Sequence, residues 1–186
     1  LTRMEEAKLS FEDALLEAQD KGFAEADPAL DVSGVDAAQK LSILSALAFG
    51  LAPDYSAMQV DGIEAICAQD ISFAGQFDCV IRLVGVTQME NGSVYQRVTP
   101  MLVRRGNNLA QVRHELNAIS VQAAPVGELF MQGPGAGGGA TASAVLGDIA
   151  DVALGFGRPL FSTLVSKMTA KSSANAPECE YYLRVG

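Results

Sequence analysis

Five charged side chains that could do chemistry are grouped in one short stretch of the sequence. They are Glu25, Asp27, Asp31, Asp36 and Lys40. Asp36 and Lys40 are four residues apart, a spacing that places two side chains on the same face of a helix. A carboxylate can bind an ammonium group, and a lysine can donate a proton to an oxygen that gains negative charge. The group therefore suits a small zwitterion.

Each of these residues also has a structural interpretation that requires no chemistry. Asp36 follows Ser33 by three residues, so the two could form a capping box at the start of a helix. Asp36 and Lys40 could be an ordinary exposed ion pair, worth about 0.3–0.5 kcal/mol. Asp27 and Asp31 could simply form turns. Residue types alone leave the chemical and the structural interpretations open.

The elements that must position this group can be predicted from hydrophobic spacing and turn residues. One helix covers residues 10–21 and opens on Ser10-Phe11-Glu12-Asp13, which resembles a capping box. A loop follows over residues 23–34. A second helix begins at residue 33 and ends at Phe49. The loop therefore runs into the helix that carries Asp36 and Lys40, so the acids and the lysine can converge on one spot.

The rest of the chain is predicted to be mostly strands, followed by one helix. The predicted strands cover residues 58–60, 79–88, 93–104, 117–123 and 126–132, with helical turns over 62–67 and 70–75 and a last helix over 141–154. Asn91-Gly92 is a strong signal for a hairpin turn between the second and third strands. This order predicts an α+β fold in which one largely antiparallel or mixed β-sheet is covered by α-helices.

Length and charge limit the kind of protein. The chain has 186 residues, which suits one domain, and its formal net charge is −9. An acidic chain is a poor partner for nucleic acid or for an anionic membrane surface, since both favour basic patches. No apolar run is long enough to span a bilayer and no signal-peptide pattern is present, so we expect a cytoplasmic protein.

Cysteine and histidine are too few for the sites that these residues usually build. Cys67, Cys79 and Cys179 form no C-x-x-C pair, and His114 is the only histidine. We therefore expect neither a disulfide framework nor a bound metal. A Ser-His-Asp or Cys-His mechanism would have to use His114, which we interpret instead as a surface residue in a loop before a strand.

The spacing between Ala18 and Lys40 favours the chemical interpretation. After the alanine come a Gly-aromatic step at Gly22-Phe23, then Asp27-Pro28, and then the pattern Asp-x-x-Gly-x-Asp-x-x-x-Lys that begins at Asp31. This arrangement resembles the signature of homoserine dehydrogenases. The resemblance continues at residues 40–44, 47–50, 117–119, 133–137 and 141–145. It covers about residues 1–154.

The resemblance implies a specific reaction. Homoserine dehydrogenases interconvert L-aspartate 4-semialdehyde and L-homoserine with NADPH or NADH, a step in the biosynthesis of threonine, methionine and isoleucine. Lys40 matches the lysine that donates a proton to the aldehyde oxygen while hydride reaches the carbon. Glu25 and Asp36 match acids that help bind the amino-acid substrate, and Asp31 belongs to the same acidic pocket.

The resemblance also implies where the cofactor lies. NADP or NAD would be bound mainly by an N-terminal Rossmann domain that precedes this chain, with Gly22, Glu25 and Gly137 beside the cofactor. By itself, the stretch 133–138 fits G-x-G-x-x-G, which is typical of a Rossmann turn. Too few residues follow for a dinucleotide-binding fold, so we interpret the stretch as the nicotinamide-side loop of the family. A tight turn that lets the helix at Thr141 pack closely is compatible with that role.

We therefore expect a partial enzyme with three parts. Residues 1–154 would form the catalytic, substrate-binding and dimerisation domain, residues 155–177 a linker, and residues 178–186 the first strand of a truncated ACT-like regulatory domain. Such a chain is expected to belong to a homodimer. It would not turn over substrate alone, because hydride transfer needs the cofactor fixed against the substrate.

Two other functions compete with this one. The apolar strands over residues 80–86 and 94–103 suit a non-catalytic dimerisation scaffold, since a sheet that carries them could pair with a copy of itself. Alternatively, the four acids between residues 25 and 36 could hold the metal of a carboxylate-based hydrolase. The hydrolase ranks lower because Lys40 would oppose a bound cation.

Overall fold

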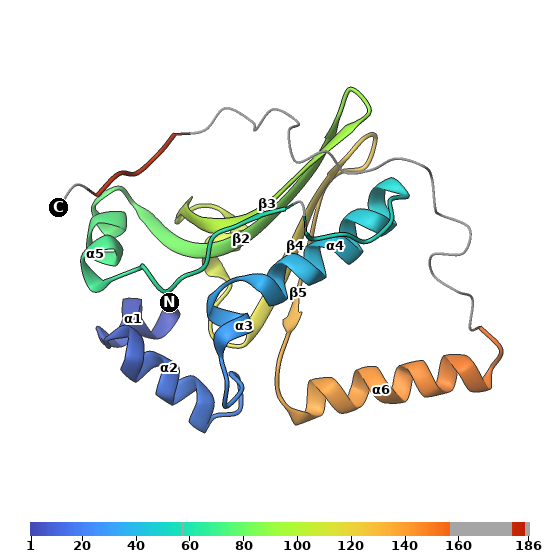
Figure 1. Ribbon diagram of the computed structural model, residues 1–186, viewed down its shortest axis with the longest axis horizontal. Coiled ribbons are helices and arrows are strands. Elements are labelled where there is room, and N and C mark those ends of the chain that lie inside the picture. Colours follow the sequence, from blue (N-terminus) through green and yellow to red (C-terminus); the bar gives the residue numbers. More distant parts are fainter. Residues whose placement is uncertain (57, 157–179, 185–186) are drawn as a thin grey trace. The chain divides into compact units, whose positions relative to one another are not determined.

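The computed structural model describes residues 1–56, 58–156 and 180–184, and Figure 1 shows its ribbon. Within the described residues, the chain divides into two compact units. The first unit contains residues 1–26, 66–82 and 102–156, and the second is built mainly from residues 27–65 and 83–101. Each unit has its own core and is described by itself.

The second unit is built on a three-stranded mixed sheet in the order β1-β3-β2. Its strands are β1 (Gln59–Val60), β2 (Cys79–Glu90) and β3 (Ser93–Arg104), of which residues 79–82 and 102–104 belong to the first unit. β1 runs parallel to β3, with Gln59 opposite Arg97. Asn91 and Gly92 join β2 to β3, and their positive φ angles of 50° and 74° are those that a tight two-residue turn requires. The hairpin prediction is therefore confirmed.

Helix α4 (Val35–Phe49) packs on this sheet and follows the short helix α3 (Ala29–Val32). The core beneath α4 consists of Ala38, Leu41, Met58 and Val98. Ser45 Oγ and Thr87 Oγ1 are 2.8 Å apart in a hydrogen bond that ties the helix to β2. The first turns of α4, which carry Asp36 and Lys40, therefore rest on a packed surface.

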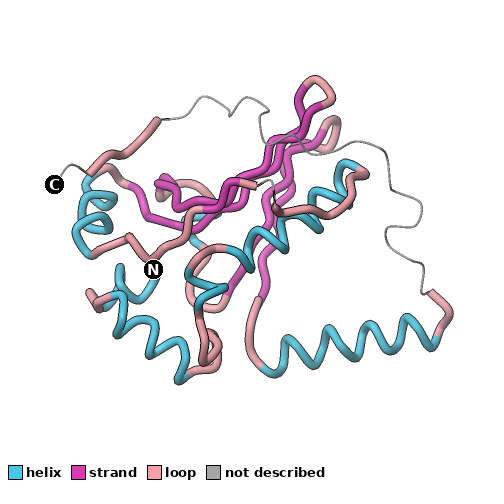
Figure 2. The backbone as a smooth tube through the Cα atoms, in the orientation of Figure 1, coloured by secondary structure: helices cyan, strands magenta, loops and turns pink. Residues whose placement is uncertain are grey.

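The first unit is built from helices and a separate strand pair (Figure 2). Its elements are α1 (Thr2–Ala7), α2 (Phe11–Asp20), α5 (Ala68–Gln76), the 3-10 helix η1 (Asn108–Gln111), β4 (Leu116–Ala123), β5 (Gly127–Pro134) and α6 (Gly138–Ala153). The predicted cap of α2 is confirmed, because Ser10 Oγ accepts a hydrogen bond from the Asp13 N–H. Ala74, Cys79 and Ile81 form the core that joins α5 to the start of β2.

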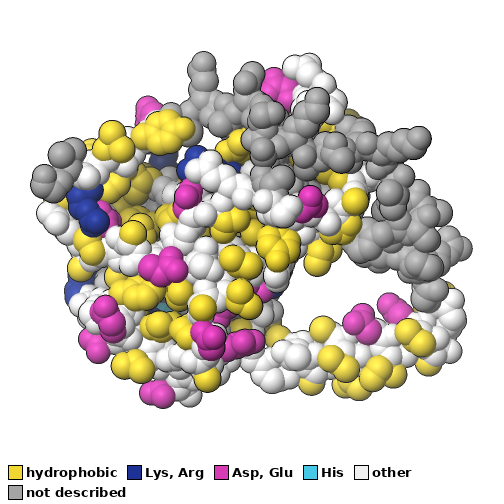
Figure 3. Space-filling model, in the orientation of Figure 1, with side chains coloured by type: hydrophobic (Ala, Val, Ile, Leu, Met, Phe, Trp, Pro, Cys, Tyr) yellow, Lys and Arg dark blue, Asp and Glu magenta, His cyan; other side chains and the backbone are white. Residues whose placement is uncertain are grey.

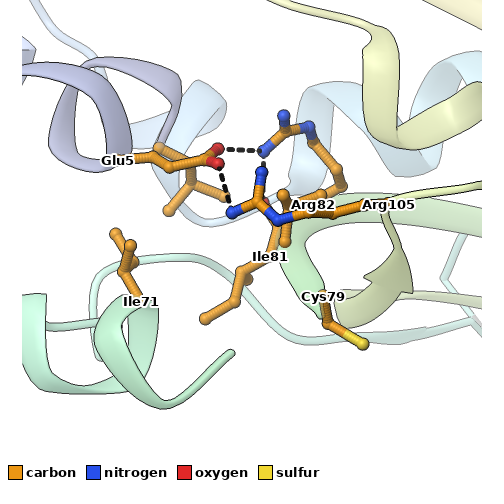
Figure 4. A pocket seen from close by; sticks show the side chains of 8 residues that line it. Glu5, Ile71, Cys79, Ile81, Arg82 and Arg105 are labelled. Carbon is orange, nitrogen blue, oxygen red and sulfur yellow. Dashed lines mark hydrogen bonds and ion pairs between the residues drawn. The ribbon is translucent and has the colours of Figure 1, made fainter. Parts of the chain in front are cut away.

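A largely buried ion pair fixes α1 within the first unit (Figure 4). The Glu5 carboxylate lies 3.5 Å from Arg82 Nη1 and 3.1 Å from Arg105 Nη2. The Arg82 guanidinium also donates to the backbone oxygens of Ala110 and Val112, at 3.1 and 3.2 Å. Burial lowers the pKa of Arg82 below its usual value, and the charge of Glu5 opposes that shift. Arg82 therefore links α1, β2 and the segment around η1.

Strands β4 and β5 form a two-stranded antiparallel sheet of their own. Their register pairs Leu116 with Pro134 and Ala123 with Gly127, and the Ala124-Pro125 peptide bond is cis. The predicted α+β class is confirmed. The prediction of one sheet is wrong, because the described strands form two sheets. Turn signals locate hairpins along a chain but do not specify which hairpins share a sheet.

Helix α6 has no buried side chain. Its hydrophobic residues are exposed along the helix, as the space-filling view shows (Figure 3). They include Val145, Leu146, Ile149 and Val152. The helix begins three residues before the predicted range of 141–154. None of the helices in the described residues is long and apolar enough to cross a membrane.

Several local predictions differ from the structure. Helices α1 and α3 were not expected, since helices of one or two turns show little periodic spacing; α3 lies in the predicted loop. Residues 62–67 contain a turn at 64–65 but not the predicted helical turn. Helix α5 is longer than the predicted 70–75. Residues 180–184 form no strand. The predicted linker over 155–177 lies almost wholly outside the described residues, so the domain boundaries stay a prediction.

Candidate active site

Lys40 and Asp36 form the polar centre of the candidate site on α4. Lys40 Nζ lies 2.6 Å from Asp36 Oδ2, and the two side chains are 59% and 39% exposed. The ion pair that their spacing predicts is therefore present. Because both groups contact solvent, the pair adds at most about 1 kcal/mol of stability. The exposed ammonium group can be reached by a small molecule.

The turn before α4 places Asp36 without a capping role for Ser33. Gly34 is the residue before the helix, with a positive φ of 80°, and no side chain caps this end. Ser33 instead ends α3 with helical backbone angles, and its hydroxyl donates to the Leu30 oxygen at 3.4 Å. The capping box considered for Ser33 and Asp36 is therefore wrong. The Asp36 carboxylate pairs with Lys40 instead.

The two acids that precede α4 differ in what they contact. Asp27 Oδ1 accepts a hydrogen bond from the Ala29 N–H at 3.2 Å, so its carboxylate shapes the turn that starts α3. Asp31 lies on α3 and is exposed. Among the described residues, its carboxylate has no hydrogen bond or ion pair. Asp31 is therefore available to a ligand, whereas Asp27 has a structural role.

Gly22 and Glu25 belong to the first unit, at the end of α2. Gly22 has a positive φ of 69°, which lets the chain reverse, and the Phe23 N–H donates to the Ala18 oxygen at 2.8 Å. The Gln19 amide donates to the Glu25 backbone oxygen at 2.9 Å. The Glu25 side chain is exposed. The predicted convergence of Glu25 with Asp36 and Lys40 stays a prediction.

The glycine-rich loop before α6 lacks the context of a Rossmann turn. Gly133 pairs with Asn117 inside the antiparallel sheet, and the Gly135 N–H donates to the Glu115 oxygen at 2.9 Å. A Rossmann turn instead follows a parallel strand and directs its N–H groups to the pyrophosphate. Gly137 precedes α6 with a φ of 103°, a conformation that favours glycine. Its contact with a cofactor stays a prediction.

Other polar groups in the described residues have structural surroundings. His114 is exposed just before β4, and its Nε2 lies 3.6 Å from Glu6 Oε2, so the surface interpretation is confirmed. The described residues contain no group of three or more His, Cys, Asp or Glu side chains that could hold a metal. A small pocket beside Glu5 is also lined by Arg82 and Arg105, which already neutralise its carboxylate.

One polar pair next to the site was not found from the sequence. Arg97 Nη2 lies 2.9 Å from Asp61 Oδ2, and this contact raises the pKa of Arg97 above its usual value. The Arg97 Nε atom is buried and has no hydrogen-bond partner within the described part of the chain. The two residues meet because β1 pairs with β3, a register that no local sequence signal specifies.

The fold and the site together define a class of protein. It is an α+β domain that exposes a lysine and carboxylates on a helix supported by a sheet. Such a site suits acid–base chemistry on a small charged molecule.

The comparison with known proteins identifies the family within this class. A family model described as homoserine dehydrogenase matches residues 1–150. The homoserine dehydrogenase of Neisseria gonorrhoeae is 43% identical over 153 residues, which cover 82% of this chain and 35% of that protein. The enzyme of the same name from Helicobacter pylori is 38% identical over 192 residues, covering 100% of this chain and 44% of that protein. The chain belongs to the homoserine dehydrogenase family and spans less than half the length of these relatives.

Solved structures show the same relationship. The crystal structure of a homoserine dehydrogenase from Thiobacillus denitrificans superposes with a TM-score of 0.82 at 34% identity, covering 91% of this chain and 41% of that one. A hyperthermophilic archaeal homoserine dehydrogenase in complex with NADPH gives a TM-score of 0.62 at 33% identity, covering 84% and 44%. The predicted family and the fold class are confirmed.

Proposed function

We propose that this chain is the substrate-binding and catalytic domain of a homoserine dehydrogenase. The full-length protein would interconvert L-aspartate 4-semialdehyde and L-homoserine with NADPH or NADH, in the biosynthesis of threonine, methionine and isoleucine. The observation that carries the proposal is the exposed Lys40–Asp36 pair on α4, at the end of the family's signature spacing. The location that we propose for the full-length protein is the cytoplasm.

Lys40 is the proposed proton donor and acceptor. During reduction, its ammonium group would give a proton to the aldehyde oxygen, and during oxidation the neutral amine would accept the proton of the homoserine hydroxyl. Asp36, whose Oδ2 is 2.6 Å from Lys40 Nζ, would orient the lysine side chain. Asp36, Asp31 and Glu25 would bind the ammonium group of the amino acid, since carboxylates are its natural partners.

The cofactor contacts of this chain are proposed at Gly22, Glu25 and Gly137. The two glycines fit a closely approaching group, because a Cβ built on either would meet no described atom within 4 Å. Both also have positive φ angles, a conformation that favours glycine. The backbone at these two positions can therefore be approached without interference from a side chain. A bound nicotinamide would supply or accept hydride. Most of the dinucleotide would be held by an N-terminal domain outside this chain, and NADP and NAD both remain candidates.

A second role, building a homodimer, is supported by the surface of the β4–β5 sheet. Ile119 pairs with Met131 and Val121 pairs with Leu129, so the four side chains share one face of the sheet. Their exposed fractions lie between 37% and 56%. An apolar face of this kind suits contact with a second copy of the chain. Assembly and catalysis would then be two functions of one domain.

Activity measurements on the full-length protein and on the 186-residue chain test both roles. We expect the full-length protein to be dimeric by light scattering and to reduce NAD⁺ or NADP⁺ when L-homoserine is added. The isolated chain should not reduce either, since the dinucleotide is held mainly elsewhere. A full-length protein without homoserine-dependent reduction would contradict the proposed reaction, and a monomer would contradict the assembly role. Turnover by the isolated chain would contradict the division of the cofactor site.

A further inference from the structure

We propose that residues 61–63, here called the 61–63 segment, position Asp31, Asp36 and Lys40, here called the Asp31–Lys40 site. Gly62 and Asp61 act as positioning residues. The inference rests on the proposed function, because it concerns the placement of its catalytic lysine and substrate-binding acids. All the residues that carry it belong to the second unit.

The 61–63 segment is hydrogen-bonded at both ends. At one end, the Asp61 N–H donates to the Val98 oxygen of β3 at 2.8 Å. At the other, the Ile63 N–H donates to the Val32 oxygen, the last residue of α3, at 2.8 Å. The segment therefore links the sheet directly to the turn between α3 and α4.

Gly62 leaves no room for a side chain on the face that meets this turn. A Cβ built on Gly62 would lie 2.5 Å from the Val32 oxygen and 2.7 Å from Ser33 Cα, both of them backbone atoms. Contacts this short force one of the two segments to move. Gly34 also lies close to the segment, because a Cβ built on it would lie 3.4 Å from the Asp61 oxygen. The two backbones are thus packed against each other through two glycines.

The turn that the 61–63 segment holds lies between the two acids of the site. Asp31 is on α3 and Asp36 is in the first turn of α4, so the conformation of Val32–Val35 sets the distance between their carboxylates. It also sets the direction in which α4 starts. Because Lys40 lies on this helix, the position of its side chain depends on that direction. A displacement at Gly62 is therefore a displacement of the acids and the lysine relative to one another.

An ion pair holds the 61–63 segment on the sheet. Asp61 Oδ2 lies 2.9 Å from Arg97 Nη2 and 3.4 Å from the Gln59 amide nitrogen. The Arg97 side chain is only 20% exposed, whereas that of Asp61 is 45% exposed. Asp61 is therefore the countercharge of a mostly buried guanidinium, and its position is fixed by β3. Removing its charge should loosen the segment without opening the core.

Steady-state kinetics of the full-length protein test this inference with two variants. Gly62→Ala should lower kcat/KM for L-homoserine by about 10- to 100-fold, because misplacement by an ångström costs a rate of this order. Part of that loss should appear as a raised KM for homoserine, while the KM for the dinucleotide stays within about twofold because most of that ligand is bound elsewhere. Asp61→Asn, a substitution at a half-exposed site, should shift the same parameters in the same direction by about 3- to 10-fold.

Gly75→Ala is the matched control, because Gly75 lies in α5 with open space around it and no positive φ. It should leave both KM values and kcat unchanged. Wild-type kcat/KM for homoserine in every folded variant would overturn the positioning role, and so would an equal rise in the dinucleotide KM. If Gly62→Ala does not fold, the kcat/KM and KM values of Asp61→Asn decide whether the 61–63 segment has a positioning role. Absence of homoserine turnover in the wild-type protein would instead overturn the proposed function, and this inference with it.

Discussion

Replacing Lys40 with alanine in the full-length protein should lower kcat for homoserine oxidation by about 10²- to 10⁴-fold, the range that a general acid–base group supplies. The lysine is 59% exposed and its ion pair with Asp36 is on the surface, so its removal should change the free energy of unfolding by less than about 1 kcal/mol. Turnover and thermal unfolding of the same preparation therefore separate a catalytic role from a structural one.

Two further variants sharpen the Lys40 prediction. Lys40→Arg keeps the positive charge beside Asp36, but a guanidinium does not release its proton at working pH, so kcat should stay low. Lys21→Ala is a matched control, because Lys21, the residue that follows α2, pairs with Glu17 at the same four-residue spacing. It should keep kcat within about twofold, as expected for a surface ion pair. Near-normal turnover of Lys40→Ala would remove Lys40 from the mechanism.

Replacing Arg82 with methionine should lower the free energy of unfolding of the first unit by about 3–5 kcal/mol, as expected when one partner of a buried ion pair is removed. The Glu5 carboxylate would lose a guanidinium at 3.5 Å, and the backbone oxygens of Ala110 and Val112 would lose their donor. The side chains of Arg82 and Glu5 are 12% and 14% exposed, so water cannot replace these contacts easily. Figure 4 shows the Glu5 carboxylate facing the guanidinium groups of Arg82 and Arg105.

Hydrogen exchange of the full-length protein measures this loss locally. The amides of residues 1–7 and 108–112 should exchange faster in Arg82→Met, because both segments depend on the guanidinium. Arg113→Met is the control, since Arg113 pairs with Glu6 at the surface with 34% of its side chain exposed. That variant should lose less than about 1 kcal/mol. Unchanged exchange in Arg82→Met would mean that the ion pair does not hold α1.

Much of the fold could be predicted because its signals are local. The cap at Ser10 and the turn at Asn91-Gly92 are each specified by a few adjacent residues, and the structure contains both. Helix α1 and helix α3 could not be predicted, because each is too short to show a hydrophobic period. Such helices are stabilised by contacts that are distant in sequence, such as the pairing of Glu5 with Arg82.

In the candidate site, too, local contacts could be predicted and contacts between distant residues could not. Asp36 and Lys40 were predicted to meet because helical spacing alone brings them together. The Asp61–Arg97 pair depends on the parallel register of β1 with β3, which joins residues far apart in the chain. The close packing of Gly62 on Val32 likewise joins residues that are far apart in the chain. The reactive groups could therefore be predicted from the sequence, while the contacts that position them required the fold.

The most direct test of Lys40 as the catalytic group is a crystal structure of the full-length protein with L-homoserine and an oxidised dinucleotide. We expect the homoserine hydroxyl within hydrogen-bond distance of Lys40 Nζ, and its ammonium group against the carboxylates of the Asp31–Lys40 site. Homoserine bound elsewhere, with no contact to Lys40, would contradict the assignment of this chain as the catalytic domain.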